Sequence, residues 1–347
     1  MISINDLQKI VKKGDTVVHT LKGITLNIEQ GQIFGVVGRK GAGKSSLIRS
    51  INLLDPPSSG AVTVDSCVLT TLSTEELRRA RRNIGMIFQH INLLNSRTVF
   101  ENIALPLEVS RAPSHTIESL VTPLLALTGL ADKAHLYPND LTMGQKQKVA
   151  IARALVLQPK VLLCDEATYG LDHKAKHSVL QLLSEINQKL NLTILLITHE
   201  IDVIKAICDR AAVLHQGEII EEGTVLELFS HPKAEITRDF IRSEARSDLP
   251  TVLKNRLQAQ PHENLSPIVR ITFADPTLED PYIAEVIQTF SLSINIIQAH
   301  LEPIRGGRMG IIIAEMIGDN EDIQQAIQSL SEKDLHIEVL GYAPRNS

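Results

Sequence analysis

Short apolar runs alternate with segments of helical periodicity through the first two thirds of the chain. Residues 32–37, 161–164 and 193–198 are apolar runs bounded by polar residues, a pattern typical of buried parallel strands. Residues 46–54 carry apolar side chains at helical spacing instead. This alternation, which continues over residues 1–242, predicts a layered α/β domain.

One part of this domain has a different pattern. Residues 89–147 consist mostly of good helix formers, which predicts a helical insertion between two strands. We expect prolines to interrupt its helices, at Pro106, Pro113, Pro123 and Pro138.

A second pattern begins after a polar stretch. Residues 243–265 are predicted to be a linker, with one short amphipathic piece around Leu253 to Leu257. Beyond it, residues 266–347 predict the order strand, helix, strand, strand, helix, strand. The expected strands are 268–273, 294–301, 309–316 and 337–340, and the expected helices 281–290 and 321–332. The order βαββαβ is that of a ferredoxin-like α+β domain, a fold that hosts many functions.

Composition excludes several classes of protein. The net charge of −5 over 347 residues leaves no broad basic surface, so we expect no nucleic acid partner. The three cysteines are far apart, which favours a reducing compartment over a disulfide framework. No apolar run approaches the ~20 residues that span a bilayer, and the first residues lack a signal-peptide core. Any membrane role is therefore expected to be peripheral.

The strongest chemical signal is a phosphate-binding loop. The pattern G-x-x-x-x-G-K-[ST] is matched by Gly38, Arg39, Lys40, Gly41, Ala42, Gly43, Lys44 and Ser45, with Ser46 continuing into the helix. A strand pattern before the loop and a helix after it aim backbone N–H groups at phosphate oxygens. We expect Lys44 to bind the outer phosphates and the Ser45 hydroxyl to ligate Mg²⁺. A chance glycine turn would not explain these flanks.

Two adjacent carboxylates end another strand pattern. Asp165 and Glu166 follow the apolar residues 162–164. Beside a phosphate loop, Asp165 is expected to hold Mg²⁺ and Glu166 to activate the attacking water. Alone, the pair could equally be an N-cap of the next helix. Together with the phosphate loop, it predicts a site of nucleotide hydrolysis.

Two further polar residues close apolar segments. His199 ends the strand pattern of residues 193–198, which we expect to lie beside the strand that ends at Asp165. Its imidazole is predicted to contact the γ-phosphate and hold the attacking water. Gln89 ends the apolar segment 86–88 and offers a neutral oxygen to Mg²⁺ or to the water. Neither residue would predict a catalytic role alone, so both predictions depend on the other motifs.

These motifs resemble those of the ATP-binding subunits of ABC transporters, whose signature Leu-Ser-Gly-Gly-Gln corresponds to residues 141–145 here. The resemblance implies a P-loop ABC ATPase domain, with ATP and Mg²⁺ as cofactors. It also implies a homodimer, in which Thr142, Gly144 and Gln145 of one subunit close over ATP held by the other. One phosphate loop and one signature per chain agree with that arrangement.

Residues 79–108 and the added C-terminal domain sharpen the resemblance, to the ATPase subunits of bacterial methionine importers. It implies ATP-driven uptake of methionine, including D-methionine and related amino acids, through an integral-membrane permease dimer. An extracytoplasmic solute-binding protein would supply the substrate, and the chain would work at the cytoplasmic face of the inner membrane. The C-terminal domain is implied to bind methionine as a regulator, for which residues 295–299 and 309–313 are the candidate segments.

Several positions depart from the family pattern. Met143 replaces a signature glycine, Tyr169 and Gly170 replace Ser-Ala, and Val11 stands where an adenine-stacking aromatic is expected. These departures keep two alternatives open: a degenerate, mainly regulatory nucleotide-binding subunit, and a soluble ABC ATPase outside transport. The second usually carries paired ATPase domains or long coiled-coil insertions, and neither pattern is present.

Overall fold

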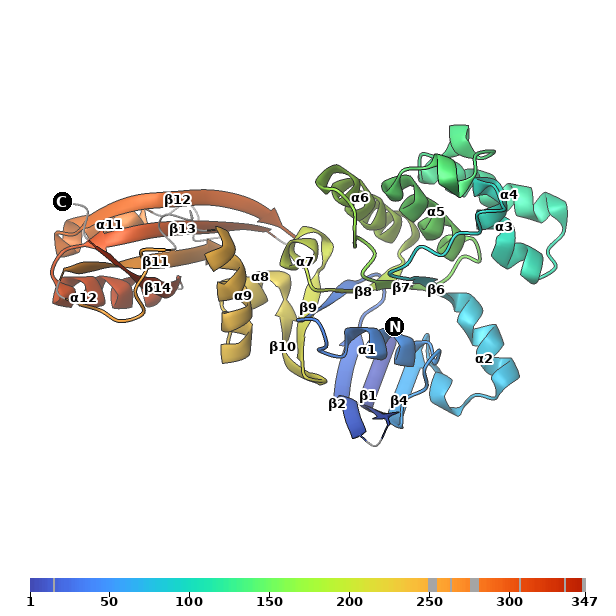
Figure 1. The fold of residues 1–347 in the computed structure, drawn as a ribbon, viewed down its shortest axis with the longest axis horizontal. Helices are drawn as coiled ribbons and strands as arrows, with labels where there is room; N and C mark the ends of the chain where they lie inside the picture. The colour runs from blue at the N-terminus through green and yellow to red at the C-terminus, as the bar shows by residue number, and fades with distance from the viewer. Residues whose placement is uncertain are drawn as a thin grey trace. The chain divides into compact units, whose positions relative to one another are not determined.

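The computed structural model describes residues 1–14, 16–248, 255–262, 264–274, 281–305, 307–333 and 335–344. The chain forms two compact units, Met1–Glu222 and Gly223–Ser347, each with its own elements (Figure 1). Among the described residues, every helix is too short or too polar to cross a bilayer.

A six-stranded sheet forms the centre of the first unit, in the order β10-β9-β3-β8-β7-β6. Its strands are β3 (Ile33–Val37), β6 (Ile84–Ile87), β7 (Val161–Asp165), β8 (Thr193–Thr198), β9 (Arg210–His215) and β10 (Glu218–Thr224). The pairs β3–β8, β7–β8 and β6–β7 are parallel, and Asp165 lies opposite Ile197. The carboxyl ends of four strands therefore meet at one edge of this sheet.

A second, antiparallel sheet packs against the first. It consists of β1 (Ile2–Lys13), β2 (Thr16–Ile28), β4 (Ser59–Val64) and β5 (Cys67–Val68), in the order β2-β1-β4-β5. Helix α1 (Lys44–Ile51) buries Leu47, Ile48 and Ile51 in a core shared with residues of both sheets. This core fixes the helix that follows the phosphate loop.

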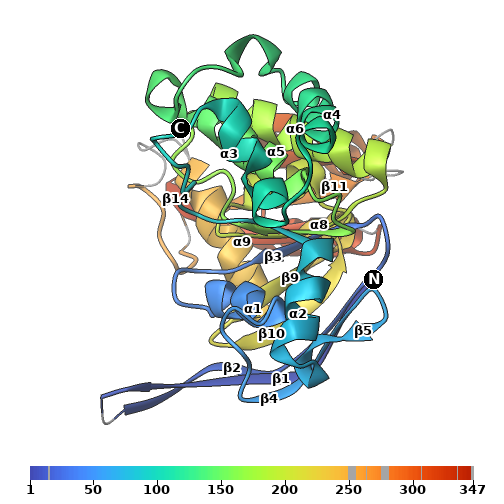
Figure 2. The ribbon, with the colours of Figure 1, turned by 90° about the vertical axis from the view of Figure 1, so that its right-hand side faces the viewer.

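Helices complete the first unit, and one group of them forms a separate layer (Figure 2). The helices are α2 (Thr74–Ala80), α3 (Val99–Val109), α4 (Ser114–Leu127), α5 (Met143–Leu155), α6 (His173–Leu190) and α7 (Ile201–Ile207). Short 3₁₀ turns lie at Leu69–Thr71, Arg81–Asn83, Ala131–Lys133 and Pro138–Asp140. Helices α3, α4 and α5 share an apolar core of their own, the predicted helical insertion.

The prediction that prolines break these helices was wrong at two positions. Pro106 lies inside α3 and Pro123 inside α4. Buried neighbours such as Val99, Ile103 and Val121 hold both helices in the apolar core, which outweighs the local cost of about 3 kcal/mol.

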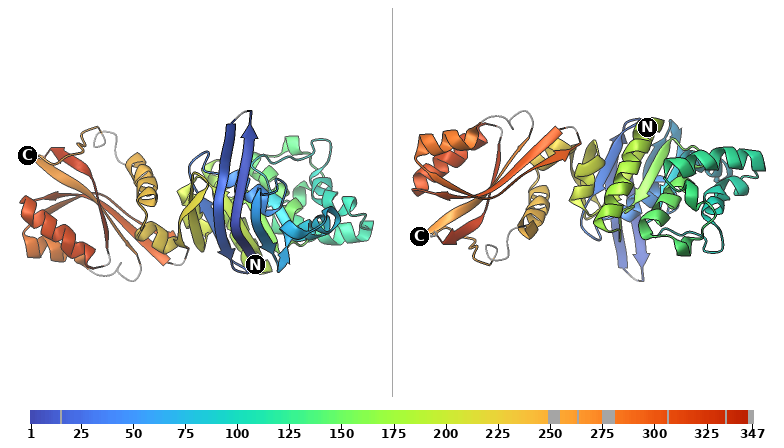
Figure 3. Two further views of the ribbon diagram at one scale, coloured as in Figure 1. Left: turned by 90° about the horizontal axis from the view of Figure 1, so that it is seen from below. Right: turned by 90° about the horizontal axis from the view of Figure 1, so that it is seen from above.

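The second unit contains an antiparallel sheet in the order β12-β13-β11-β14. Its elements are α8 (Val225–Ser230), α9 (Glu235–Asp248), β11 (Leu265–Ala274), α11 (Tyr282–Phe290), β12 (Ser293–Ile304), β13 (Gly307–Ile317), α12 (Asn320–Ser331) and β14 (His336–Pro344). Helices α11 and α12 cover one face of the sheet and share its core (Figure 3). The predicted ferredoxin-like βαββαβ order is thus confirmed.

The segment between the two patterns is described only in part. Helix α9 runs to Asp248, whereas we expected the ATPase domain to end at residue 242 and the linker to begin at residue 243. The predicted amphipathic piece around Leu253 to Leu257 lies partly outside the described residues, and the described residues 255–257 are not helical.

Candidate active site

The polar residues predicted from the sequence converge at the carboxyl edge of the parallel strands. The phosphate loop follows β3, His199 follows β8, Asp165 and Glu166 end β7, and Gln89 follows β6. Because these four strands are neighbours in the sheet, their ends form one cluster. Open α/β sheets bind ligands at this edge.

The phosphate loop is held in a conformation that needs glycine. Gly43 has φ of +110°, and a Cβ there would lie 2.6 Å from the Thr20 carbonyl oxygen of β2. Helix α1 begins directly after it at Lys44, with no side chain capping its first N–H groups. Those N–H groups, including those near Ser45 and Ser46, are available to an anion.

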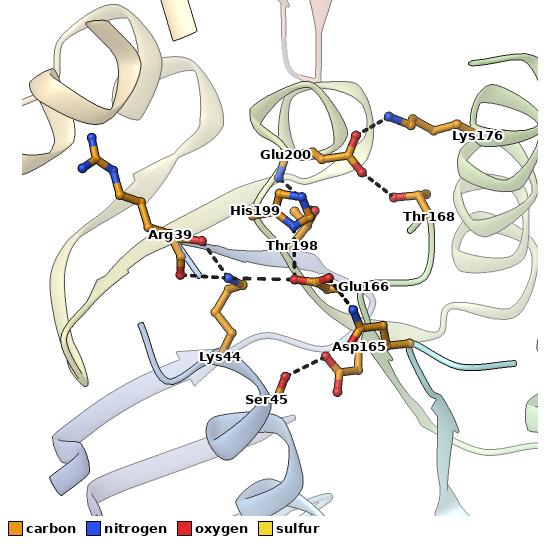
Figure 4. Close-up of polar contacts among 12 residues, drawn as sticks. Arg39, Lys44, Ser45, Asp165, Glu166, Thr168, Lys176, Thr198, His199 and Glu200 are labelled. Atoms are coloured by element: carbon orange, nitrogen blue, oxygen red, sulfur yellow. Dashed lines mark hydrogen bonds and ion pairs between the residues drawn. The ribbon is translucent and has the colours of Figure 1, made fainter. Parts of the chain in front are cut away.

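Lys44 is the central cation of the site. Its side chain is only 6% exposed, and Nζ donates to the carbonyl oxygens of Gly38 at 2.7 Å and Arg39 at 3.2 Å (Figure 4). Burial lowers the pKa of Lys44, an effect that the charges of Glu166 and Asp165 oppose. Arg39 and Lys40 of the same loop are exposed.

Ser45 and Asp165 form a pair of oxygen donors. The Ser45 hydroxyl donates to Asp165 Oδ1 at 3.3 Å, and the Asp165 side chain is buried. Burial raises the pKa of Asp165, while the hydrogen bond from Ser45 and the charge of Arg49 lower it. A hydroxyl and a carboxylate beside a phosphate loop are a donor set that suits Mg²⁺, so the residues present fit that ion.

Glu166 is the most constrained side chain of the cluster. Its φ of +49° is rare for a residue with a side chain, and its N–H donates to the Ile197 carbonyl at 3.0 Å. Oε1 lies 3.1 Å from His199 Nδ1 and 3.9 Å from Lys44 Nζ. Oε2 accepts a hydrogen bond from Gln89 Nε2 at 3.1 Å. Residues from all four strand ends thus meet at one carboxylate.

Sequence reasoning missed a supporting network next to His199. Glu200 accepts a hydrogen bond from the Thr168 hydroxyl at 3.3 Å and forms an ion pair with Lys176 of α6 (Figure 4). It ties the loop after Glu166 to the end of β8. The only signal in the sequence was a carboxylate directly after the histidine.

The signature segment is placed differently from the other predicted residues. Thr142 caps helix α5 in a capping box with Gln145, whose N–H donates to the Thr142 hydroxyl at 3.3 Å. A Cβ on Gly144 would lie 2.9 Å from Ala175 Cβ of α6, so glycine permits close helix packing. Among the described residues, no hydrogen bond or ion pair joins residues 142–145 to the phosphate loop.

Met143 begins α5 and is 50% exposed. Its φ is not in the left-handed region, so its backbone is unstrained and only its bulk distinguishes it from glycine. We expect Met143→Gly to raise phosphate release by the full-length chain about two- to fivefold, because less than ~1 kcal/mol of steric cost is removed. The measurement is steady-state release at saturating ATP and Mg²⁺.

Met143→Ala is the matched control for this prediction, because alanine removes the bulk without the backbone freedom of glycine. Equal acceleration by both variants assigns the effect to bulk. An unchanged rate in both variants contradicts the steric interpretation.

Comparisons with known proteins cover both units of the chain. A family model described as ABC transporter matches residues 21–169, and one described as NIL domain matches residues 267–339. The Methionine import ATP-binding proteins MetN of Vibrio vulnificus (strain YJ016) and Escherichia coli (strain K12) are each 49% identical over 342 residues. These alignments cover 99% of this chain and 99% and 100% of the relatives.

Solved structures match about two thirds of the chain. The ATP-binding cassette MJ0796, solved as a dimer in a post-hydrolysis state with ADP and Pi, is 33% identical with a TM-score of 0.60. That match covers 65% of this chain and 99% of the cassette. The protein cbiO1 of Clostridium perfringens, part of the ABC transporter complex cbiONQ, is 30% identical with a TM-score of 0.61. That match covers 72% of this chain and 96% of cbiO1.

The fold is therefore that of an ATP-binding cassette ATPase, an enzyme that hydrolyses ATP. ATP-binding cassette ATPases serve many systems. The NIL domain of the second unit distinguishes this chain from cassettes that lack such a domain. The chain belongs to the family of methionine import ATP-binding proteins.

Proposed function

We propose that the chain is the ATP-hydrolysing subunit of an importer that takes up methionine through a separate membrane permease. Full-length identity of 49% to methionine import ATP-binding proteins is the observation that supports it most directly. We further propose a homodimer of these subunits on a permease dimer, at the cytoplasmic face of the inner membrane. An extracytoplasmic solute-binding protein would deliver the substrate.

In this proposal the phosphate loop and α1 hold the triphosphate. Residues 38–46 supply N–H groups and the Lys44 cation, and Mg²⁺ would be held by Ser45, Asp165 and the Gln89 side chain. When bound, Mg²⁺ neutralises charge on the phosphate oxygens. The hydrogen bond from Ser45 to the buried Asp165 supports this assignment, since it already joins two of these donors.

Hydrolysis is proposed to proceed by attack of water on the γ-phosphorus. A new P–O bond forms, the bond to the β–γ bridging oxygen breaks, and ADP leaves with that electron pair. Glu166 takes the proton of the attacking water, while Gln89 and His199 hold its carboxylate in place. Lys44 and the N–H groups of α1 stabilise the negative charge on the phosphoryl oxygens.

A partner subunit is proposed to complete the site. Thr142, Gly144 and Gln145 lie at the N-terminus of α5, where N–H groups favour an anion. Since no hydrogen bond or ion pair among the described residues joins them to their own phosphate loop, we assign them to ATP held by the partner. The dimeric state of the solved cassette MJ0796 supports this arrangement.

The second unit is proposed to sense methionine and regulate transport. We keep the division into an ATPase domain (1–242), a linker (243–265) and a regulatory domain (266–347). The candidate segments 295–299 and 309–313 lie on the paired strands β12 and β13, with Ala299 opposite Ile312. Apolar side chains with Asn295 nearby, whose Nδ2 lies 3.5 Å from Glu315 Oε2, suit a thioether amino acid.

Titration calorimetry of L-methionine into the full-length chain tests this function. We expect saturable heat with one ligand per chain, reproduced by neither L-leucine nor glycine, because a regulatory site for methionine would have to discriminate side chains. Asn295→Ala is expected to weaken binding at least tenfold, since a hydrogen bond to a charged ligand contributes about 1.5–3 kcal/mol. No heat with methionine, in a folded chain that hydrolyses ATP, would contradict the methionine assignment and leave the ATPase intact.

A further inference from the structure

Tyr169 is a large aromatic side chain beside the proposed site. It lies in the loop after Glu166 and is 47% exposed, although its ring lies beside that of His199. A half-exposed ring on a tight catalytic loop needs an explanation, because its burial contributes only part of the usual apolar stabilisation.

The Tyr169 ring contacts one residue of the site. Its centroid lies 6.4 Å from that of the His199 imidazole, with the planes inclined at 59°. This tilted arrangement is one that aromatic rings prefer. The His199 side chain is 40% exposed, and its hydrogen bond is to Glu166 Oε1 at 3.1 Å. Tyr169 and Glu166 thus restrain the imidazole together.

The backbone that carries Tyr169 is itself fixed. Its N–H donates to the Glu166 carbonyl at 3.0 Å, and Gly170 then turns the chain with φ of +74°. On the preceding side, the Thr168 hydroxyl is bonded to Glu200. The ring is therefore attached to the same short turn that sets the position of the Glu166 carboxylate.

Tyr169 also lines a hollow next to the site. A hollow of about 380 Å³ is lined by Tyr169 and Gly170 together with Gln89, Met143 and Lys146. A smaller residue at 169 would enlarge this hollow towards His199. The imidazole could then leave Glu166 by rotating about its side-chain torsions, since no second ring would contact it.

We infer that Tyr169 is a positioning residue, which holds the His199 imidazole against the Glu166 carboxylate. The inference rests on the proposed roles of Glu166 and His199 in hydrolysis. Tyr169 acts through His199 and touches no reacting atom. Its hydroxyl is not required, because the contact is between rings.

The test compares kcat and KM for ATP in full-length variants. Tyr169→Ser is expected to lower kcat about three- to tenfold with KM for ATP changed less than twofold, because the ring orders a catalytic group and not the nucleotide. Tyr169→Phe is expected to keep the kcat of the parent chain, because it keeps the ring. Tyr137→Ser is the matched control, since Tyr137 is also a tyrosine with 47% exposure but lies at the start of the 3₁₀ turn Pro138–Asp140.

A double-mutant cycle with His199→Ala separates this inference from the proposed function. If Tyr169 acts through His199, Tyr169→Ser adds no further loss in the His199→Ala background. Fully additive losses, or an unchanged kcat in Tyr169→Ser alone, overturn the positioning role. An unchanged kcat in His199→Ala alone would instead contradict the proposed role of His199 itself.

Discussion

Glu166→Gln is expected to lower phosphate release by about 100- to 1,000-fold while ATP still binds, because glutamine cannot take the proton of the attacking water. The amide has nearly the same shape, so the contacts with Gln89 and His199 need not collapse. ATP affinity is expected to be equal or higher, since one negative charge is removed 3.9 Å from Lys44 Nζ. Single-turnover phosphate release and nucleotide titration measure the two effects.

Glu200→Gln is the matched control for this experiment. Glu200 is a carboxylate that follows the neighbouring strand β8, and its side chain pairs with Lys176 and Thr168. We expect Glu200→Gln to lower phosphate release less than tenfold, because the loop after Glu166 loses only part of its support. Equal losses in both variants would mean that loop order, and not a base at Glu166, limits the reaction.

Lys44→Ala is expected to weaken ATP binding by about 10- to 150-fold, since a charge-assisted hydrogen bond to phosphate contributes about 1.5–3 kcal/mol. Lys44 is already desolvated and aligned by the Gly38 and Arg39 carbonyls, so little ordering remains to be done on binding. A fluorescent ATP analogue measures the affinity, because the chain contains no tryptophan.

Lys40→Ala separates position from charge, because Lys40 lies in the same loop but is exposed. Lys40→Ala is expected to weaken ATP binding by less than about threefold, because an exposed charge contributes little, as in exposed ion pairs. Thermal unfolding of both variants excludes a general loss of fold. Lys44→Ala that binds ATP as tightly as the parent chain would contradict the assigned role of Lys44.

Much of the site could be predicted from the sequence because its residues follow short apolar runs. A polar residue directly after a buried strand lies at the edge of the sheet, and adjacent parallel strands bring Glu166 and His199 together. The phosphate loop and its glycines specify a local conformation in the same way. The βαββαβ order of the second unit was likewise readable, since each element has its own period.

The rest depended on contacts between segments far apart in the chain. Local proline chemistry predicted breaks at Pro106 and Pro123, but packing in the helical layer prevailed. No periodicity reveals the positive φ of Glu166 or the approach of Tyr169 to His199. The function of the signature residues 142–145 is also not visible within one chain, because the ATP proposed to bind them is held by another subunit.

The helical layer begins and ends at neighbouring strands. It leaves the sheet after β6 and returns at β7, and these strands pair from Ile84 opposite Val161 to Ile87 opposite Cys164. Because the strands are parallel, the layer leaves at Ile87 and returns at Val161, three positions back along the pairing, so its two attachment points are about 11 Å apart. Such an insertion is closed whatever its length, so its loop-closure entropy places little limit on its size. We therefore expect chimeric proteins to accept an exchanged layer, provided that Gln89 and residues 142–145, which belong to the proposed site, are kept.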